Sequence, residues 1–304
     1  MTNEEKELLA KISDLHELPE GAYNIRLNGE GYKRHSTEDI EIVPKTDKPG
    51  IDIIVKPNVV GKSVHIPVIV SRTGLKDLVY NDFYIGEGSD VLIVAGCGIH
   101  NTGDKTSEHN GIHAFHLGKN SKVRYVERHF GQGEGDRVLN PVTEVELGEN
   151  SSMIMETTQM GGVSNAIRTT NANVGKNASL VIKEKILTTN SQIAETNFNV
   201  ELIGENSSVD VVSRSVAKDD SSQTFHSNVI GKNKSFGHVE CDAIMTGQSH
   251  VKSIPEIDAI DNNATLVHEA AIGKIAGEQL IKLMTLGLDE HQAEDLIIQG
   301  FLNN

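Results

Sequence analysis

Two cysteines and a set of histidines are the residues of this 304-residue chain whose types suit chemistry. Cys241 stands near His238 in the sequence, and His268-Glu269 follows within 30 residues. Thiolate and imidazole are ligands for iron–sulfur clusters, and a carboxylate can hold ferrous iron. These residues therefore predict a sulfur nucleophile or a soft-metal site. A small buried thiol is an equally good interpretation of Cys241 alone.

A second set of metal-ligand residue types lies earlier in the chain. It begins with a Cys-x-x-His motif and continues with three histidines: Cys97, His100, His109, His113 and His116. These types suit zinc or iron, and the long interval around them could fold back on itself. The spacing does not match a zinc finger, and the alternative is a solvated histidine-rich loop.

A repeated turn signature must position both sets. Gly-x-Gly or Gly-x-Asn recurs at intervals of 27 to 32 residues, beginning at Gly86, Gly118, Gly148, Gly175, Gly204 and Gly231. Such tetrads suit tight turns with a positive φ. Alternating apolar residues follow each turn, as at Val209 and Val211, and each repeat holds a second strand-like stretch. The period predicts a mainly β chain folded as a flattened parallel β-helix, one repeat per coil.

The distance from each turn glycine predicts which way a side chain points. Offsets of five and seven residues hold the apolar pairs, so they should face inward. This count places His238 and His268 inside and Cys241 and Glu269 on the outer face. It also aligns Lys185 and Arg214 with Cys241, where the Arg214 guanidinium would favour the thiolate.

The two ends of the chain depart from the repeat. We expect a helix opened by the capping box Thr2-Asn3-Glu4-Glu5, with irregular β structure completing residues 1–84. Residues 85–270 form the β-helix core, and 271–304 change to a helical period with Asp289 capping the second helix. Apolar residues of this segment either cap the solenoid or dock a partner: Leu283, Met284, Leu296 and Phe301.

Composition excludes several functions. The formal net charge of -15 would repel nucleic acid. Without an apolar leader or a long apolar run, we expect no membrane contact and a cytoplasmic chain whose two cysteines stay reduced. Gly61-Lys62-Ser63 imitates a phosphate-binding loop, but Lys56 stands where that loop needs glycine, so we expect this chain to bind no nucleotide.

Near the C-terminus the chain resembles the SufB/SufD family of iron–sulfur cluster assembly scaffolds. The resemblance covers roughly residues 85 to 302 and is most specific in the last 70 or so. It rests on six stretches: Gly237-His238-Val239-Glu240-Cys241-Asp242-Ala243-Ile244, Ile254-Pro255-Glu256-Ile257, Val267-His268-Glu269-Ala270-Ala271-Ile272-Gly273-Lys274-Ile275, Glu278-Gln279-Leu280, Leu283-Met284-Thr285-Leu286-Gly287-Leu288 and Ile297-Ile298-Gln299-Gly300-Phe301.

The resemblance implies a right-handed parallel β-helix whose C-terminal helices dock SufC, an ABC-type ATPase. It implies that Cys241 lies at a subunit interface and takes part in assembling a transient cluster, together with Glu269 and His268. The chain is shorter than the usual SufB and lacks its long N-terminal region with further cysteines. This length suggests a minimal system in which one scaffold pairs with itself as a homodimer.

The function implied is therefore a scaffold rather than an enzyme, with ATP hydrolysis in the partner and with a sulfur donor and apoprotein acceptors as further partners. Two alternatives remain. One is a zinc- or iron-binding structural interaction module built on Cys97 and the loop histidines. The other is a carbohydrate-active β-helix, which the absence of tryptophan, of a secretion signal and of an evident carboxylate pair disfavours.

Overall fold

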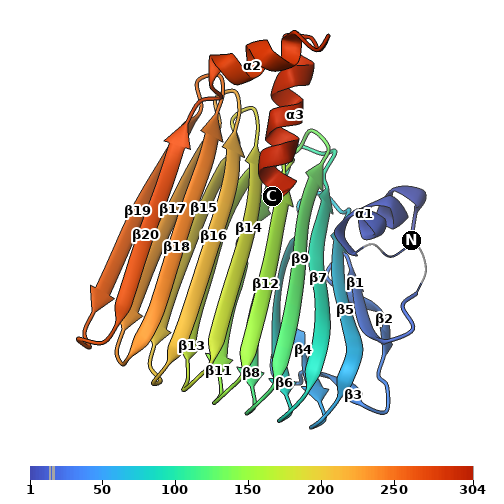
Figure 1. Ribbon diagram of the computed structural model, residues 1–304. Helices are drawn as coiled ribbons and strands as arrows, with labels where there is room; N and C mark the ends of the chain where they lie inside the picture. Colours follow the sequence, from blue (N-terminus) through green and yellow to red (C-terminus); the bar gives the residue numbers. More distant parts are fainter. Residues whose placement is uncertain (14, 16–17, 304) are drawn as a thin grey trace.

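The computed structural model describes residues 1–13, 15 and 18–303 and consists of a β-solenoid of about eight turns with helices at both ends of the chain (Figure 1). Two ten-membered sheets form its walls. Neighbouring strands pair in parallel, except the antiparallel pairs β1–β2 and β3–β4 at the N-terminal end. This confirms the predicted parallel β-helix.

The first sheet contains, in spatial order, β2 (Glu30–His35), β1 (Ala22–Leu27), β5 (Val60–Val70), β7 (Asp90–His100), β9 (Lys122–Gln132), β12 (Ser152–Met160), β14 (Ser179–Thr188), β16 (Ser207–Ala217), β18 (Ser235–Met245) and β20 (Thr265–Gly273). We call it sheet A.

The second sheet, sheet B, contains β19 (His250–Ala259), β17 (Ser222–Gly231), β15 (Ile193–Leu202), β13 (Asn165–Val174), β10 (Arg137–Leu139), β8 (Ser107–Leu117), β6 (Lys76–Ile85), β4 (Gly50–Val55) and β3 (Ile40–Pro44). β11 (Val142–Leu147) also pairs with β8 and β13, so β10 and β11 together make one rung.

Alternation along each strand creates the core. Inward positions are buried and outward positions are partly exposed, as in the strictly alternating β15 and β17. One cluster of buried aliphatic and aromatic side chains runs through almost the whole solenoid, from Ala22 to Cys241. Parallel pairing begins at β1, which pairs with β5, and continues with β4–β6 and β5–β7, so coils already stack before residue 85.

The turn glycines from Gly86 to Gly204 stack in a column, as predicted, whereas Gly231 pairs with Leu202 and precedes its turn. A Cβ atom on Gly204 would lie 2.0 Å from the backbone nitrogen of Lys176 in the coil before it, so this position requires glycine. The positive φ belongs to the asparagine two residues later, at 52° for Asn177 and 59° for Asn206. The Asn206 side-chain amide donates to Oδ1 of Asn177 at 3.2 Å, which ties neighbouring turns together.

Helix α1 (Asn3–Ser13) covers sheet A near the N-terminal end. Its capping box is confirmed: the backbone nitrogen of Thr2 donates to Glu5 at 2.7 Å, and that of Glu5 donates to Thr2 at 3.2 Å. Leu8 and Ile12 pack on the sheet around Ile69.

Helices α2 (Gly277–Met284) and α3 (Glu290–Asn303) follow the last coil but do not cover it. Ile298 and Leu302 of α3 pack against Val216 of β16, two strands back from the end of sheet A. Figure 1 shows α3 in front of sheet A and away from its last strand, β20. Asp289 caps α3 as expected, accepting from the backbone of Gln292 at 2.8 Å. The interpretation of these helices as an end cap is therefore wrong. No described helix is long and apolar enough to cross a membrane.

We predict that Gly204→Ala destabilises the protein by about 2 kcal/mol, because the new methyl group forces two stacked turns apart. Urea unfolding would measure this loss. Gly273→Ala is the control, since a Cβ there meets nothing within 4 Å. Equal stability of the two variants would contradict the required close approach at the turn column.

Candidate functional site

Cys241 lies on β18 with its sulfur inside the solenoid, and only 1% of the residue is exposed. Its register partners are Ser213 of β16 and Ala270 of β20. Burial is the largest influence and raises the pKa of the thiol to about 11; the Ser253 hydroxyl opposes this rise and the charge of Glu184 adds to it. Within this single chain, Cys241 is therefore a neutral thiol at neutral pH.

The expectation that Cys241 faces outward beside Arg214 is wrong, because the predicted count of positions along β18 is shifted by one residue. Gly237 and Val239 pair with the inward Val209 and Val211, yet they stand six and eight residues after Gly231 rather than five and seven. Gly231 itself is the last residue of β17 and pairs with Leu202, so it precedes the turn. Because side chains alternate, this shift turns every side chain of β18 to the opposite face.

His268 of β20 faces inward, as predicted, and shares the interior with Cys241. It pairs with Val239, so it lies one rung and two residues from the cysteine. Neither ring nitrogen makes a hydrogen bond within the described residues, although both are buried. Burial lowers the pKa of His268, and the neighbouring charge of His238 lowers it further. The result is a neutral imidazole with a free lone pair.

His238 lies on the outer face, against expectation, because it takes part in the same register shift. Its Nδ1 lies 2.8 Å from Oδ1 of Asp210 on the preceding rung. Its partner on β20 is the exposed Val267, not His268. The two histidines on neighbouring rungs therefore point to opposite faces and form no pair.

Carboxylates gather on the outer face behind Cys241. Glu240 and Glu269 are register partners on β18 and β20, so their side chains leave the same face of adjacent strands. Arg214 lies 3.7 Å from Glu240 and pairs in register with Asp242 and, as predicted, with Lys185. Burial and the hydrogen-bonded Asp242 raise the pKa of Glu240, and Arg214 opposes them. The Arg214 guanidinium therefore interacts with these carboxylates and not with the Cys241 sulfur.

Cys97 occupies an inward position on β7 near the other end of the solenoid. It pairs with His129 of β9, and both residues line a small internal cavity with His109 and His113. Burial raises the pKa of the Cys97 thiol well above its usual value, and the charges of Asp77 and Glu127 add to the rise.

The histidines around Cys97 are already held by other groups. His109 Nδ1 lies 3.1 Å from Asp77, and His113 Nδ1 lies 2.8 Å from the Tyr125 hydroxyl. Burial lowers the pKa of His113 to about 4, so this ring stays neutral at neutral pH. Both Nδ1 atoms are therefore already in contact with other protein groups.

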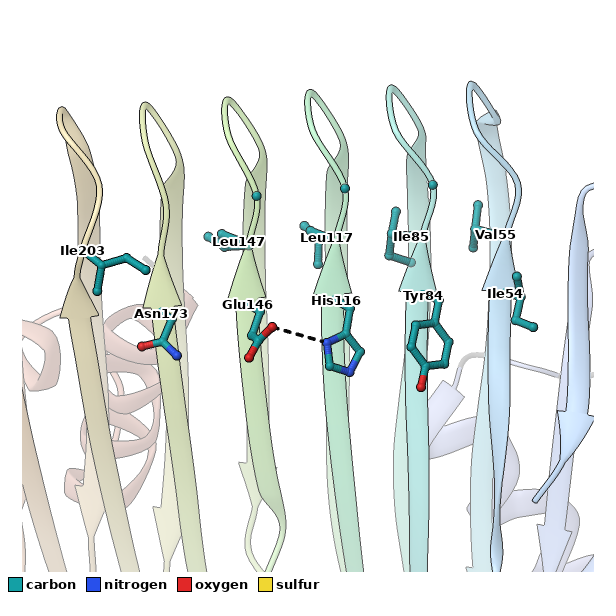
Figure 2. Close-up of a pocket in the computed structure, with 13 residues that line it drawn as sticks. Ile54, Val55, Tyr84, Ile85, His116, Leu117, Glu146, Leu147, Asn173 and Ile203 are labelled. Atoms are coloured by element: carbon teal, nitrogen blue, oxygen red, sulfur yellow. Dashed lines mark ion pairs between the residues drawn. The ribbon is translucent and has the colours of Figure 1, made fainter. Parts of the chain in front are cut away.

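The remaining two histidines of this set lie elsewhere. His100 Nδ1 meets the Gln132 side chain at 2.8 Å. His116 lies on the outer face of sheet B, where it points to Glu146 at 3.6 Å across a shallow groove of about 620 Å³ (Figure 2). The prediction of a folded-back loop is wrong, because these residues form β7 and β8. Among the described residues, no group of three or more histidine, cysteine, aspartate or glutamate side chains is arranged to hold a metal ion.

A buried polar column inside sheet A was not anticipated. Consecutive rungs place inward side chains directly above one another, in the order Glu127, Thr157, Glu184, Ser213 and Cys241. The Ser213 hydroxyl donates to Glu184 at 2.8 Å. Arg168, from sheet B, reaches Glu127 at 2.5 Å and Glu184 at 3.7 Å. Polar residues at alternating strand positions could have indicated this column. The sequence does not show which residues of sheet A and sheet B meet in the interior.

Fold and site together define the class: a parallel β-solenoid whose last two coils carry a buried thiol and an unpaired imidazole. The family model for the SufBD core domain of SUF-system iron–sulfur cluster assembly matches residues 81–301. The chain belongs to this family.

Similar proteins support this assignment. A Methanocaldococcus jannaschii protein named as an iron–sulfur cluster assembly SufBD family protein is 28% identical over 79% of this chain and 76% of its own length. A Pyrococcus horikoshii protein with the same family name is 27% identical over 96% of this chain and 84% of its own length. An Archaeoglobus fulgidus relative is 30% identical over 80% and 66%.

We predict that the Cys241 thiol titrates near pH 11, because its buried thiolate would lack solvation. Ultraviolet absorbance of the thiolate in a Cys97→Ser variant measures this directly. The same step disappears in a Cys97→Ser/Cys241→Ser control. A midpoint below the ordinary value of 9.0 would contradict a neutral resting thiol.

Proposed function

We propose that this chain is a scaffold that assembles an iron–sulfur cluster at an interface between two copies of itself. Membership of the family supports a role in cluster assembly, and one observation supports the location of the assembly site. Cys241 and His268 share the inward face of the last two coils, and no described segment covers that end of the solenoid. Thiolate and neutral imidazole are the donor types found on iron–sulfur clusters.

A single copy supplies too few donors. One thiolate and one imidazole fall short of the four ligands that a cluster usually takes from protein. A two-fold axis through the open end brings a second Cys241 and a second His268 to the first pair. The symmetric dimer thereby supplies the missing ligands.

The open end has the surface of an interface. β19 and β20 are the edge strands of sheets B and A, so each leaves one row of backbone groups without a strand partner. Ile257 lies in line with the buried Val229 but is 49% exposed, since no further coil covers it. Ile260, in the following turn, is 61% exposed. A second copy would cover both of these apolar side chains.

Iron and the thiol need different environments. Glu240 and Glu269 on the outer face suit incoming ferrous iron, which binds oxygen ligands, and the edge strand β20 brings this face next to the interior. To bind iron, the Cys241 thiol must lose its proton, and burial opposes this loss because it raises the pKa of the thiol. Opening of the interface therefore has to accompany cluster assembly, and the partner ATPase supplies this change.

The ATPase docks on the C-terminal helices. Helix α2 has no buried residue, and apolar side chains project from it and the following turn: Ile281 is 63% and Leu286 76% exposed. Met284 at 42% and Leu296 at 50% extend this surface, with the partly buried Leu283 and Phe301 beside them. Several exposed apolar side chains on these two helices favour a protein-binding site here.

The remaining assignments follow from the scaffold role. The chain is not itself an enzyme, and ATP hydrolysis belongs to the SufC-type partner. A sulfur donor delivers sulfur, and apoproteins accept the finished cluster. A reducing cytoplasm suits two free buried thiols.

Anaerobic reconstitution with ferrous iron and sulfide tests the site. We expect Cys241→Ala to abolish the brown cluster absorbance and His268→Ala to lower bound iron roughly tenfold or more, because each removes a ligand. His238→Ala is the matched control on the neighbouring rung and opposite face, and should retain the cluster. A normal cluster in Cys241→Ala, with none in Cys97→Ala, would move the site to Cys97.

The dimer has its own test. Changing Ile257 and Ile260 to glutamate places charges on the open end, so we expect a dimer of the unchanged chain to become monomeric in sedimentation analysis. Ile154→Glu is the control, since Ile154 is 41% exposed on the outer face of β12, in the middle of sheet A. Unchanged association of the double variant would place the interface elsewhere.

Docking of the ATPase is tested with Met284→Glu/Leu296→Glu. We expect co-purification with the ATPase to be lost while the β signal in circular dichroism is unchanged, because both side chains are exposed. Truncation after Ile272 is less selective, because it also removes the α3 residues packed on Val216. Ile193→Glu, on sheet B, should bind normally. Binding that survives the double variant rules out this surface.

A further inference from the structure

The groove beside His116 runs along the outer face of sheet B, next to the column of turns (Figure 2). We call it the sheet B groove. Strand register places five of its side chains in one row, on the consecutive strands β4, β6, β8, β11 and β13: Ile54, Tyr84, His116, Glu146 and Asn173. At about 4.8 Å per strand, this row is roughly 19 Å long. Ile203, just after β15, extends the groove by one more strand.

The turn glycines create the hollow. Gly86, Gly118 and Gly148 each follow a member of the row by two residues and carry no side chain. A Cβ on Gly86 would lie 2.5 Å from the backbone of Pro57, and one on Gly148 would lie 2.6 Å from that of Leu117. Close packing of the coils therefore requires glycine here, and it leaves a channel beside the row of outward side chains.

The two ends of the groove are apolar. Ile54 is 39%, Tyr84 43% and Ile203 46% exposed. The Tyr84 and His116 rings stack with their centroids 5.1 Å apart and 12° between their planes, which orders the exposed tyrosine beside the channel. Large apolar side chains exposed along one groove favour contact with another molecule.

The middle of the groove carries a carboxylate without a lysine or arginine. The Glu146 side chain is 67% exposed, and its ion-pair partner among the described residues is His116, at 3.6 Å. Glu201, two strands farther along the same row, instead meets Lys232 of the following coil at 2.5 Å. A cation from outside this chain can take the corresponding place beside Glu146.

The neighbouring outward row adds to the negative charge. It holds three more carboxylates, Asp52, Asp82 and Glu144. Lys45 pairs with Asp52 and Asp82. The four carboxylates of these two rows therefore have a single lysine and no arginine as ion-pair partner among the described residues. Such a surface attracts a cationic ligand and repels nucleic acid.

The shape of the groove selects a chain over a small molecule. Pockets for small ligands enclose most of the ligand surface, whereas this groove is shallow and lies along an open sheet face. An extended peptide advances about 3.3 Å per residue, so roughly six residues match the length of the row.

We propose that the sheet B groove binds an extended peptide segment of a partner protein, with a lysine or arginine at Glu146 and apolar side chains at Tyr84 and Ile203. Tyr84 and Ile203 come from β6 and just after β15, two strands to either side of Glu146. Two strands are about 10 Å, or three residues of extended chain. The segment therefore has a basic residue with an apolar residue three places away on each side, and this pattern fits in either chain direction.

This proposal does not depend on cluster assembly, because the groove includes neither Cys241 nor the C-terminal helices. Asn173 offers the segment a further contact. Its exposed side-chain amide makes no hydrogen bond to a described residue, so it can donate to and accept from a peptide backbone.

Fluorescence anisotropy with a labelled, end-blocked peptide, Leu-Ser-Ser-Lys-Ser-Ser-Leu, tests the proposal. Two matched peptides carry glutamine or glutamate in place of the lysine. We expect the lysine peptide to bind about fivefold more tightly than the glutamine peptide, as for an exposed charge pair, and the glutamate peptide to bind most weakly. Added salt should narrow these differences.

Two variants separate the charge from the apolar contact. Glu146→Gln should abolish the preference for lysine over glutamine, and Tyr84→Ala should weaken both peptides about tenfold through lost apolar contact. Glu195→Gln is the control, since it removes the same charge from the outer face of β15, outside the groove, and should keep the preference.

Three results would overturn the proposal. One is a lysine peptide that does not bind the unchanged chain, and another is a lysine preference that survives Glu146→Gln. The third is a Tyr84→Ala variant that binds the peptides normally but changes the oligomeric state in sedimentation analysis, because the occupant of the groove would then be a second copy of this chain.

Discussion

Parallel stacking of coils about 4.8 Å apart is the constraint on which the rest of this structure depends. Each backbone group of an inner rung pairs with the rungs before and after it, so a residue's position along the strand fixes whether its side chain lies inside or outside. The turn column holds this register because glycine allows the stacked backbones to touch and asparagine adopts the left-handed conformation. A change of one residue at a single turn therefore inverts a whole strand. The turn after Gly231 differs in this way from the predicted count, so Cys241 lies in the core and not on the surface.

The same stacking makes the interior a dry place in which polar groups must satisfy one another. Arg168 crosses from sheet B to two carboxylates of sheet A, and Ser213 completes the hydrogen bonding of Glu184. Groups that find partners in this way stay fixed in the fold. Some buried polar atoms have no described partner, such as Thr157 Oγ1, and in His268 both ring nitrogens are in this state. An imidazole without a described partner, one rung and two residues from a neutral thiol, is costly to bury, which favours a role for both groups in binding something the single chain lacks.

The two ends of this solenoid differ in structure. At the C-terminal end the stack stops without a cap, and core-type residues such as Ile257 remain half exposed. At the N-terminal end, the antiparallel pairs β1–β2 and β3–β4 end the parallel stack, and helix α1 packs on the adjoining face of sheet A.

The sequence by itself determined the features that depend on local pattern. The period of the turn glycines predicted the parallel β-helix, Thr2 and Glu5 predicted the first helix cap, and Asp289 predicted the last. The motifs around Cys241 and His268 also identified the family. Only the tertiary structure decided the direction of Cys241 and His238, because a one-residue shift leaves the alternation of β18 intact while exchanging its faces. It alone brought Arg168 to Glu127 and placed α3 on β16, because contacts between sheets and between distant elements leave no period in the sequence.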